Sequence, residues 1–125
     1  MKHAINWFEI PVKNFETSKA FYEAILDSQL QVVEMKEMGS VMGFLPADME
    51  NQGVGGSIIQ GPGYEPSDKG ALVYLNGGDD LSIPLARIES AGGKVILPKT
   101  SIGENGFMAQ FLDPEGNKVA FHSMN

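Results

Sequence analysis

The same order of strand and helix patterns occurs twice along this chain, and that repetition limits the possible folds more than any other feature. In each half, one strand pattern precedes a helix pattern, and three further strand patterns follow it. Phe8 aligns with Tyr74 and Phe15 aligns with Leu81, although the two halves share few identical residues. The sequence therefore predicts two modules of β-α-β-β-β order.

The first half contains one helix pattern among four strand patterns. Strands are expected at residues 4–12, 30–35, 41–45 and 54–60, and a helix at 15–26. Asn14 is suited to cap this helix, and Phe21 and Ile25 lie four residues apart on one of its faces. Pro11 cannot donate a backbone hydrogen bond, so the first strand should end, or lie at a sheet edge, near it.

The second half begins after residues 61–70, whose glycines, prolines and charged side chains are typical of a linker. Strands are expected at residues 71–76, 94–97, 107–112 and 117–122, and a helix at 81–91. Gly92 and Gly93 follow this helix, where a left-handed C-terminal cap favours glycine. We therefore expect a single domain over residues 1–125, with module one at about 3–60, the linker at 61–70 and module two at about 71–125.

Composition excludes several classes of function. The chain has no cysteine, which rules out disulfides, thiolate metal sites and a cysteine nucleophile. Its formal net charge of −7 disfavours nucleic acids and anionic membrane surfaces as partners. No apolar run approaches the roughly 18 to 20 residues of a membrane span, and no signal-peptide pattern is visible, so we expect a cytoplasmic protein.

Three segments together carry a family resemblance. Residues 5–22 contain a strand pattern, a short acidic turn and a helix with a Phe-Tyr pair, residues 87–95 form the end of the second helix, and residues 111–119 contain an Asp-Pro-Glu-Gly turn. In this order they resemble the glyoxalase, bleomycin-resistance and extradiol-dioxygenase superfamily, also called vicinal oxygen chelate. The resemblance implies an α+β fold in which two βαβββ modules form a curved mixed sheet around a small-molecule cavity. It also implies a homodimer.

Metal-binding members of this superfamily supply His, Glu or Gln ligands from the first and last strand of each module, a donor set suited to divalent metals. The corresponding positions here are Trp7, Gly56 or Ser57, Ala71 or Val73, and Ala120. An indole and a methyl group cannot coordinate a divalent cation. The resemblance therefore implies a cavity without the usual metal site, and no cofactor is expected.

Glu9 and His122 leave alternatives open, because each lies two residues beyond a nominal ligand position and so shares its strand face. They could form a displaced two-ligand site that binds a divalent metal weakly, or an acid–base pair of a metal-independent enzyme. Desolvation would raise the pKa of Glu9 and favour its action as a base. Glu9 could equally be a buried carboxylate paired with a neighbour, and His122 a hydrogen-bonded or exposed side chain.

Three aromatic side chains could stack on a flat ligand, with polar groups orienting it. The catalytic candidates are Glu9 and His122, and the ligand-binding candidates are Trp7, Ser57, Tyr74, Phe107 and Gln110. Each aromatic residue could instead belong to the core. The expected function is binding of a small organic molecule without the usual metal, with or without catalysis. The alternatives are a metal-dependent lyase or dioxygenase and a drug-binding resistance protein without turnover.

Overall fold

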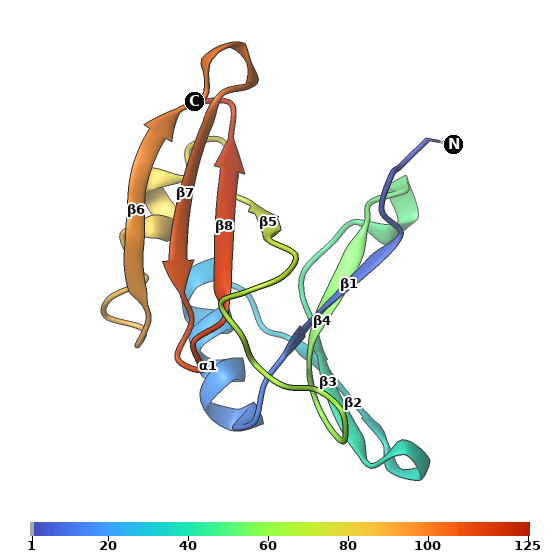
Figure 1. Cartoon of the computed structure of the whole chain (residues 1–125). Coiled ribbons are helices and arrows are strands. Elements are labelled where there is room, and N and C mark those ends of the chain that lie inside the picture. Colours follow the sequence, from blue (N-terminus) through green and yellow to red (C-terminus); the bar gives the residue numbers. More distant parts are fainter. Residues whose placement is uncertain (1) are drawn as a thin grey trace.

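The computed structural model describes residues 2–125 and contains two four-stranded mixed sheets (Figure 1). In module one the strand order is β1-β4-β3-β2, and in module two it is β5-β8-β7-β6. The first and last strands of each module are parallel neighbours, and the remaining pairs are antiparallel. The expected α+β fold with two repeated modules is therefore confirmed.

Module one follows the predicted elements closely. It consists of β1 (Trp7–Pro11), α1 (Phe15–Leu26), β2 (Gln31–Met35), β3 (Ser40–Phe44) and β4 (Gly55–Gln60). The side chain of Asn14 accepts a hydrogen bond from the Thr17 amide at 3.1 Å, as an N-terminal cap should. Asp27 ends the helix in the left-handed conformation, with φ of 49°. The bounds of α1 therefore match the sequence prediction.

Module two departs from the prediction at two elements. It consists of β5 (Val73–Asn76), α2 (Ser82–Leu85), β6 (Lys94–Ser101), β7 (Phe107–Leu112) and β8 (Lys118–Ser123). The helix predicted at 81–91 is wrong in extent, because backbone bonds after α2 alternate between three-residue and four-residue spacing, as at Ile88 and Ala91. β6 runs four residues beyond its predicted end at Leu97. It is an edge strand, which tolerates Pro98 and two irregularities in its pairing.

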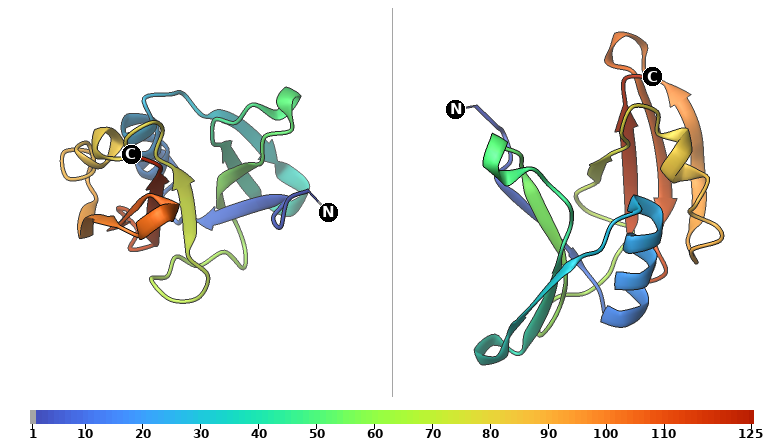
Figure 2. Two further views of the ribbon diagram at one scale, coloured as in Figure 1. Left: turned by 90° about the horizontal axis from the view of Figure 1, so that it is seen from above. Right: turned by 180° about the vertical axis from the view of Figure 1, so that it is seen from behind.

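The two modules share one hydrophobic core. It contains side chains from α1 and α2 and from one side of each sheet: Ile10, Val12, Phe15, Phe21, Tyr22, Ile25, Leu30, Leu45, Ile58, Leu75, Leu81, Ile88, Ala109, Phe111, Val119 and Phe121. Phe21 of α1 packs against Phe111 of β7, with ring centroids 6.1 Å apart. The helix of module one therefore covers part of the sheet of module two, as the rear view in Figure 2 also shows.

Hydrogen bonds, one of them fully buried, join the two modules to each other. The hydroxyl of Tyr22 donates to Asp113 at 2.8 Å, and the side-chain amide of Asn117 donates to the Pro11 carbonyl at 2.7 Å. Glu115 accepts from the backbone amide of Lys13 at 2.7 Å. The turn between β7 and β8 is thereby attached to the end of β1 and the start of α1.

Each sheet has a second side that faces away from the shared core, and we call this side its open face. Side chains alternate between the two sides of a strand, so the registers assign every strand residue to one of them. Figures 1 and 2 show the sheets inclined to each other and spread apart towards the end where the N-terminus lies. Within one chain, the open face of module one and the open face of module two therefore do not cover each other.

Candidate functional site

The open face of module one presents an aromatic pair. Trp7 on β1 pairs in register with Gly55 on β4, and its indole meets the ring of Phe44 edge-on at 5.5 Å. A Cβ added to Gly55 would lie 3.1 Å from the indole, so glycine lets the ring lie across the strand. Trp7 is 37% exposed. Its ring therefore packs on one side and remains accessible on the other.

Ser57 lies beneath this aromatic pair, in register with both Glu9 and Phe44. Its residue is fully buried, and its hydroxyl has no hydrogen-bond partner among residues 2–125. A buried hydroxyl without a partner costs free energy, so such a group in a native fold needs an explanation. Because the hydroxyl is enclosed by the chain, a ligand on the open face can reach it only if the side chains that cover it move.

Glu9 lies on the same face as Trp7 and Ser57 and contacts the segment between the modules. Tyr64 in this segment lies close to Glu9, whose negative charge raises the pKa of the Tyr64 phenol. Glu9 is exposed, so the structure does not place it as a buried carboxylate. Tyr64 was not among the predicted site residues, because nothing in a Gly-Pro linker pattern indicates where its aromatic side chain will lie.

The open face of module two carries Tyr74, Gln110 and His122. Tyr74 pairs with Ala120, which pairs with Gln110, so the three side chains form one row across β5, β8 and β7. His122 lies one row further along β8, beside Asn76. Tyr74 is 48% exposed. This face therefore also presents an accessible aromatic ring with polar neighbours.

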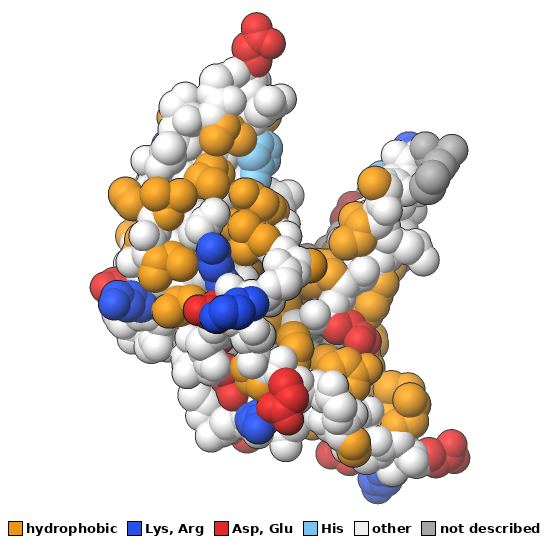
Figure 3. All heavy atoms as spheres, viewed as in Figure 1, with side chains coloured by type: hydrophobic (Ala, Val, Ile, Leu, Met, Phe, Trp, Pro, Cys, Tyr) orange, Lys and Arg blue, Asp and Glu red, His pale blue; other side chains and the backbone are white. Residues whose placement is uncertain are grey.

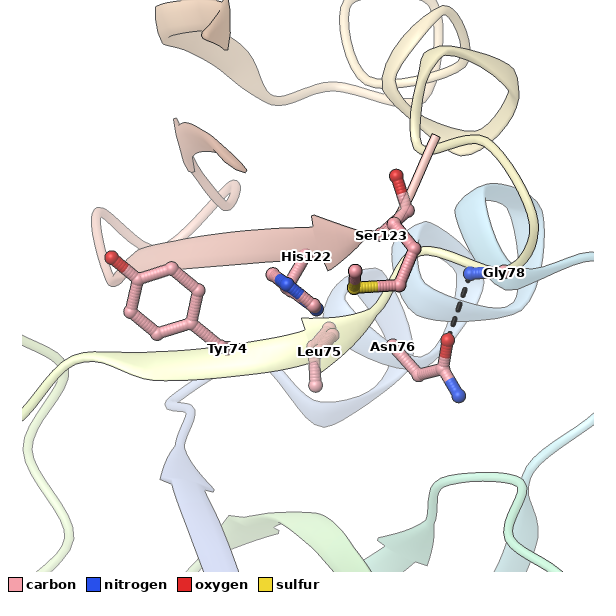
Figure 4. A pocket seen from close by; sticks show the side chains of 7 residues that line it. Tyr74, Leu75, Asn76, Gly78, His122 and Ser123 are labelled. Atoms are coloured by element: carbon pink, nitrogen blue, oxygen red, sulfur yellow. Dashed lines mark hydrogen bonds between the residues drawn. The ribbon is translucent and has the colours of Figure 1, made fainter. Parts of the chain in front are cut away.

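A cavity of about 470 Å³ lies at the end of this face (Figure 4). It is lined by Tyr74, Leu75, Asn76, Gly78, His122, Ser123 and Met124. The Nε2 atom of His122 lies 2.6 Å from the carbonyl oxygen of Asn105, so one ring nitrogen is already engaged with the backbone. Figure 4 shows the His122 side chain beside that of Tyr74, with Asn76 and Gly78 further along the chain from Tyr74.

Phe107 lies on the other side of the sheet from these residues. It alternates along β7 with Met108 and Gln110, packs against the shared core, and receives the Lys99 ammonium 4.6 Å from its ring centroid. This placement favours packing over ligand contact, and Phe107 is left out of the site proposed below.

One chain does not bring Glu9 and His122 into one cavity. His122 lines the cavity at the end of module two, whereas Glu9 lines a smaller one of about 140 Å³ beside the linker. The two residues belong to different sheets, and in the described part of the chain no hydrogen bond or ion pair joins them. Their predicted role as an acid–base pair remains a prediction.

The positions that correspond to the superfamily's metal ligands do not fit a metal ion. Tyr74, and not Ala71 or Val73, lies opposite Ala120 on the open face, while Val73 faces the core. Trp7 and Ser57 occupy the equivalent face of module one. Within residues 2–125, no group of three or more His, Cys, Asp or Glu side chains is placed to hold a metal ion. The donor set is therefore unsuited to the usual metal.

No helix in residues 2–125 is both long enough and apolar enough to cross a membrane.

Comparisons with known proteins place this geometry in a family. A family model described as Glyoxalase/Bleomycin resistance protein/Dioxygenase superfamily matches residues 4–121. A glyoxalase/bleomycin resistance protein from Albidiferax ferrireducens T118 has a TM-score of 0.71 at 16% identity, covering 98% of this chain and 100% of that one. The fosfomycin resistance protein FosX from Listeria monocytogenes has a TM-score of 0.65 at 16% identity, covering 100% and 94%.

Glyoxalase I from Zea mays has a TM-score of 0.69 at 20% identity, covering 98% of this chain and 48% of that one. The present chain thus spans about half the length of the maize enzyme. At these identities the structural likeness shows the fold alone. No curated protein matches this chain. The match of the family model over nearly the whole chain confirms the resemblance seen in the sequence: the chain belongs to the glyoxalase, bleomycin-resistance and dioxygenase superfamily.

Proposed function

We propose that this protein is a homodimer that binds a small, flat organic molecule without the superfamily's usual metal. In this proposal, the open face of module one in one copy meets the open face of module two in the other, and the ligand lies between them. The observation that carries the proposal is the exposure of an aromatic ring on each open face, with Trp7 37% and Tyr74 48% exposed. Large accessible aromatic surfaces mark binding sites.

Pairing of two copies is proposed because one chain leaves Trp7 and Tyr74 partly exposed on these faces, although Ser57 and Ala120 on the same faces are buried. The shared core occupies the space between the other sides of the two sheets, so each open face needs a cover from outside the chain. A two-fold dimer supplies two such covers at once, since module one of each copy meets module two of the other. This arrangement would produce two equal pockets.

Recognition in each pocket would combine stacking with a few polar contacts. Trp7 and Tyr74 offer ring faces from the two sheets, and Gln110 offers an amide in the same row as Tyr74. The buried, unpartnered hydroxyl of Ser57 would bond to an oxygen or nitrogen atom of the ligand once binding moves the side chains that cover it. Polar atoms placed this sparsely in an aromatic pocket favour a flat organic molecule over a sugar or a nucleotide.

A metal-independent enzyme is the second candidate, favoured by the placement of Glu9 and His122 on the two faces that would meet. Glu9 of one copy and His122 of the other would then share a pocket, as an acid–base pair requires. Glu9→Gln would abolish turnover of a bound substrate while the far-UV circular dichroism spectrum stays unchanged. Full turnover by this variant would exclude a catalytic role for Glu9.

Complementation between variants tests the shared pocket directly. Light scattering should give twice the chain mass of 13.5 kDa, and the fluorescence of N-phenylnaphthylamine, a neutral aromatic probe, should rise on binding. Trp7→Ala and Tyr74→Ala should each abolish this rise, whereas Ile83→Ala, at an exposed apolar side chain of α2, should preserve it.

Mixing the two binding-deficient variants should restore binding. Random exchange makes half of the dimers mixed, and each mixed dimer has one intact pocket of two, so about a quarter of the sites should recover. A pocket formed within one chain would recover nothing, because no chain in the mixture carries both aromatic residues. A monomeric mass, or no recovery after exchange, would refute the proposal of a shared pocket.

A further inference from the structure

Three lysines gather at one end of the open face of module two. Lys94 on β6 and Lys118 on β8 both pair with Leu112 on β7, so their side chains stand in one row on this face. Lys69, from the segment between the modules, lines the same 140 Å³ cavity as Lys118. Figure 3 shows Lys or Arg side chains gathered at this end of module two.

This row is positively charged although the protein as a whole is acidic. The chain has a net charge of −7 and only nine Lys and Arg residues. Lys69 has an exposed ion pair with its neighbour Asp68 at 3.3 Å, but within residues 2–125 no carboxylate lies within 4.0 Å of Lys94 or Lys118. The Lys94 and Lys118 ammonium groups are therefore available to an anion.

Two carboxylates lie in the neighbourhood of Lys118 and are close to other groups as well. Glu9 and Glu65 line the same cavity as Lys118. Glu65 forms an ion pair with Lys13 at 2.8 Å, and Glu9 lies close to the Tyr64 phenol. Among residues 2–125, neither carboxylate forms an ion pair with Lys118, so its ammonium group has no carboxylate partner within 4.0 Å.

The position of the lysine row relative to Tyr74 sets the size of ligand that it suits. Lys118, Ala120 and His122 alternate along β8 on one face, about 7 Å apart in each step. Tyr74 stands beside Ala120. A ring system stacked on Tyr74 and lying over Ala120 would therefore place a substituent of one or two bonds' length next to Lys118.

We propose that the ligand of this protein is an aromatic or otherwise flat anion, whose carboxylate, sulfonate or phosphate group is bound by Lys118 and Lys94 while its ring stacks on Tyr74. This inference rests on the proposed small-molecule function and names the chemical class of its ligand. Lys94 and Lys118 stand on either side of Leu112, about 10 Å apart at the backbone, a span that two flexible lysine side chains can bridge to hold one anionic group between them. Lys69, already paired with Asp68, contributes less.

A pair of probes that differ by one anionic group tests this inference. Anilinonaphthalene sulfonate and N-phenylnaphthylamine share the same ring system, and only the first carries a negative charge. Lys118→Gln should weaken binding of the sulfonate about threefold, and the double variant Lys94→Gln/Lys118→Gln about tenfold. Binding of the neutral probe should stay unchanged in both variants.

Lys36→Gln is the matched control, because it removes the same charge from an exposed lysine between β2 and β3. It should leave binding of both probes unchanged. If it weakens binding of the sulfonate probe as much as Lys118→Gln does, the effect is one of net charge, and the inference is overturned. If the wild-type protein binds the neutral probe and Lys118→Gln leaves sulfonate binding unaltered, the anion site is refuted and the proposed function stands. If the wild-type protein binds neither probe, both proposals fail.

Discussion

Replacing Tyr22 with phenylalanine removes one hydroxyl from the contact between the modules, and we expect it to lower the free energy of unfolding by about 2 kcal/mol. The phenolic oxygen lies 2.8 Å from the Asp113 carboxylate, and both residues are buried. A hydrogen bond to a charged acceptor contributes about 1.5 to 3 kcal/mol, and the substitution leaves that acceptor with one donor fewer. Phenylalanine keeps the ring, whose centroid lies 4.9 Å from that of Phe21, so little packing is lost.

Urea unfolding followed by far-UV circular dichroism, extrapolated to water, measures this difference. Tyr64→Phe is the matched control, because the Tyr64 phenol also lies close to a carboxylate, that of Glu9, but near the surface. The control should keep the unfolding midpoint of the wild-type protein. A Tyr22→Phe variant within about 0.5 kcal/mol of wild type would refute the reasoning, since that is the range of an ordinary surface substitution.

The loss in free energy of unfolding caused by Tyr22→Phe should also depend on pH, and the structure predicts the direction of that dependence. Burial raises the pKa of Asp113 above its ordinary value of 3.8, although hydrogen bonds from Asn117 and Tyr22 oppose the shift. The native state therefore keeps this proton to higher pH than the unfolded chain does. The contribution of this group to stability is complete below the unfolded pKa and is lost as pH rises through the native pKa. The Tyr22→Phe penalty should shrink as pH falls, because protonation makes the acceptor neutral.

Three further predictions concern the surface and the metal. A hydrogen bond from Lys99 lowers the pKa of Asp80 to about 2. The contribution of Asp80 to stability should therefore be present above the ordinary pKa of 3.8 and be lost as the pH falls through about 2. An NMR titration that gives the ordinary pKa for this carboxyl group would contradict the prediction. Glu9→Gln should lower the pKa of Tyr64 towards its ordinary value, because the Glu9 charge is the main cause of the rise; an ultraviolet difference titration with no change would disprove that contact. Zinc or nickel should leave the thermal midpoint within about 1 °C, and a rise reversed by chelator would reveal a metal site.

Local sequence signals, such as a helix cap and the spacing of apolar residues, were sufficient to predict the bounds of the first helix. α1 begins after an Asn14 cap and has its apolar residues on one face, so its bounds could be predicted. The second helix shows the limit of this reasoning. Leu81 and Ile88 have helical spacing and are both buried, yet regular helical bonds stop after Leu85. Periodicity reports which side chains face the core, and turns can satisfy that requirement as well as a helix does.

The sequence predicts which face of a strand most candidate side chains occupy, but it does not predict how the two sheets come together to form a pocket. Alternation along β1 and β8 places Trp7 with Glu9, and Ala120 with His122, as expected from their spacing. The residue opposite Ala120 is Tyr74, one position further along β5 than expected. A shift of one residue along a strand places the side chain on the other face of the sheet. How two sheets incline depends on the helix packed between them, and no local pattern encodes that angle.

The attachment of the turn between β7 and β8 has a consequence for ligand affinity. Glu115 and Asn117 of module two bond to the end of β1 and the start of α1, so this turn helps to set the inclination of the two sheets. In a two-fold pair, a small change in their inclination would widen or narrow both pockets together. A substitution in this distant turn would then alter the affinity for a molecule that it never touches.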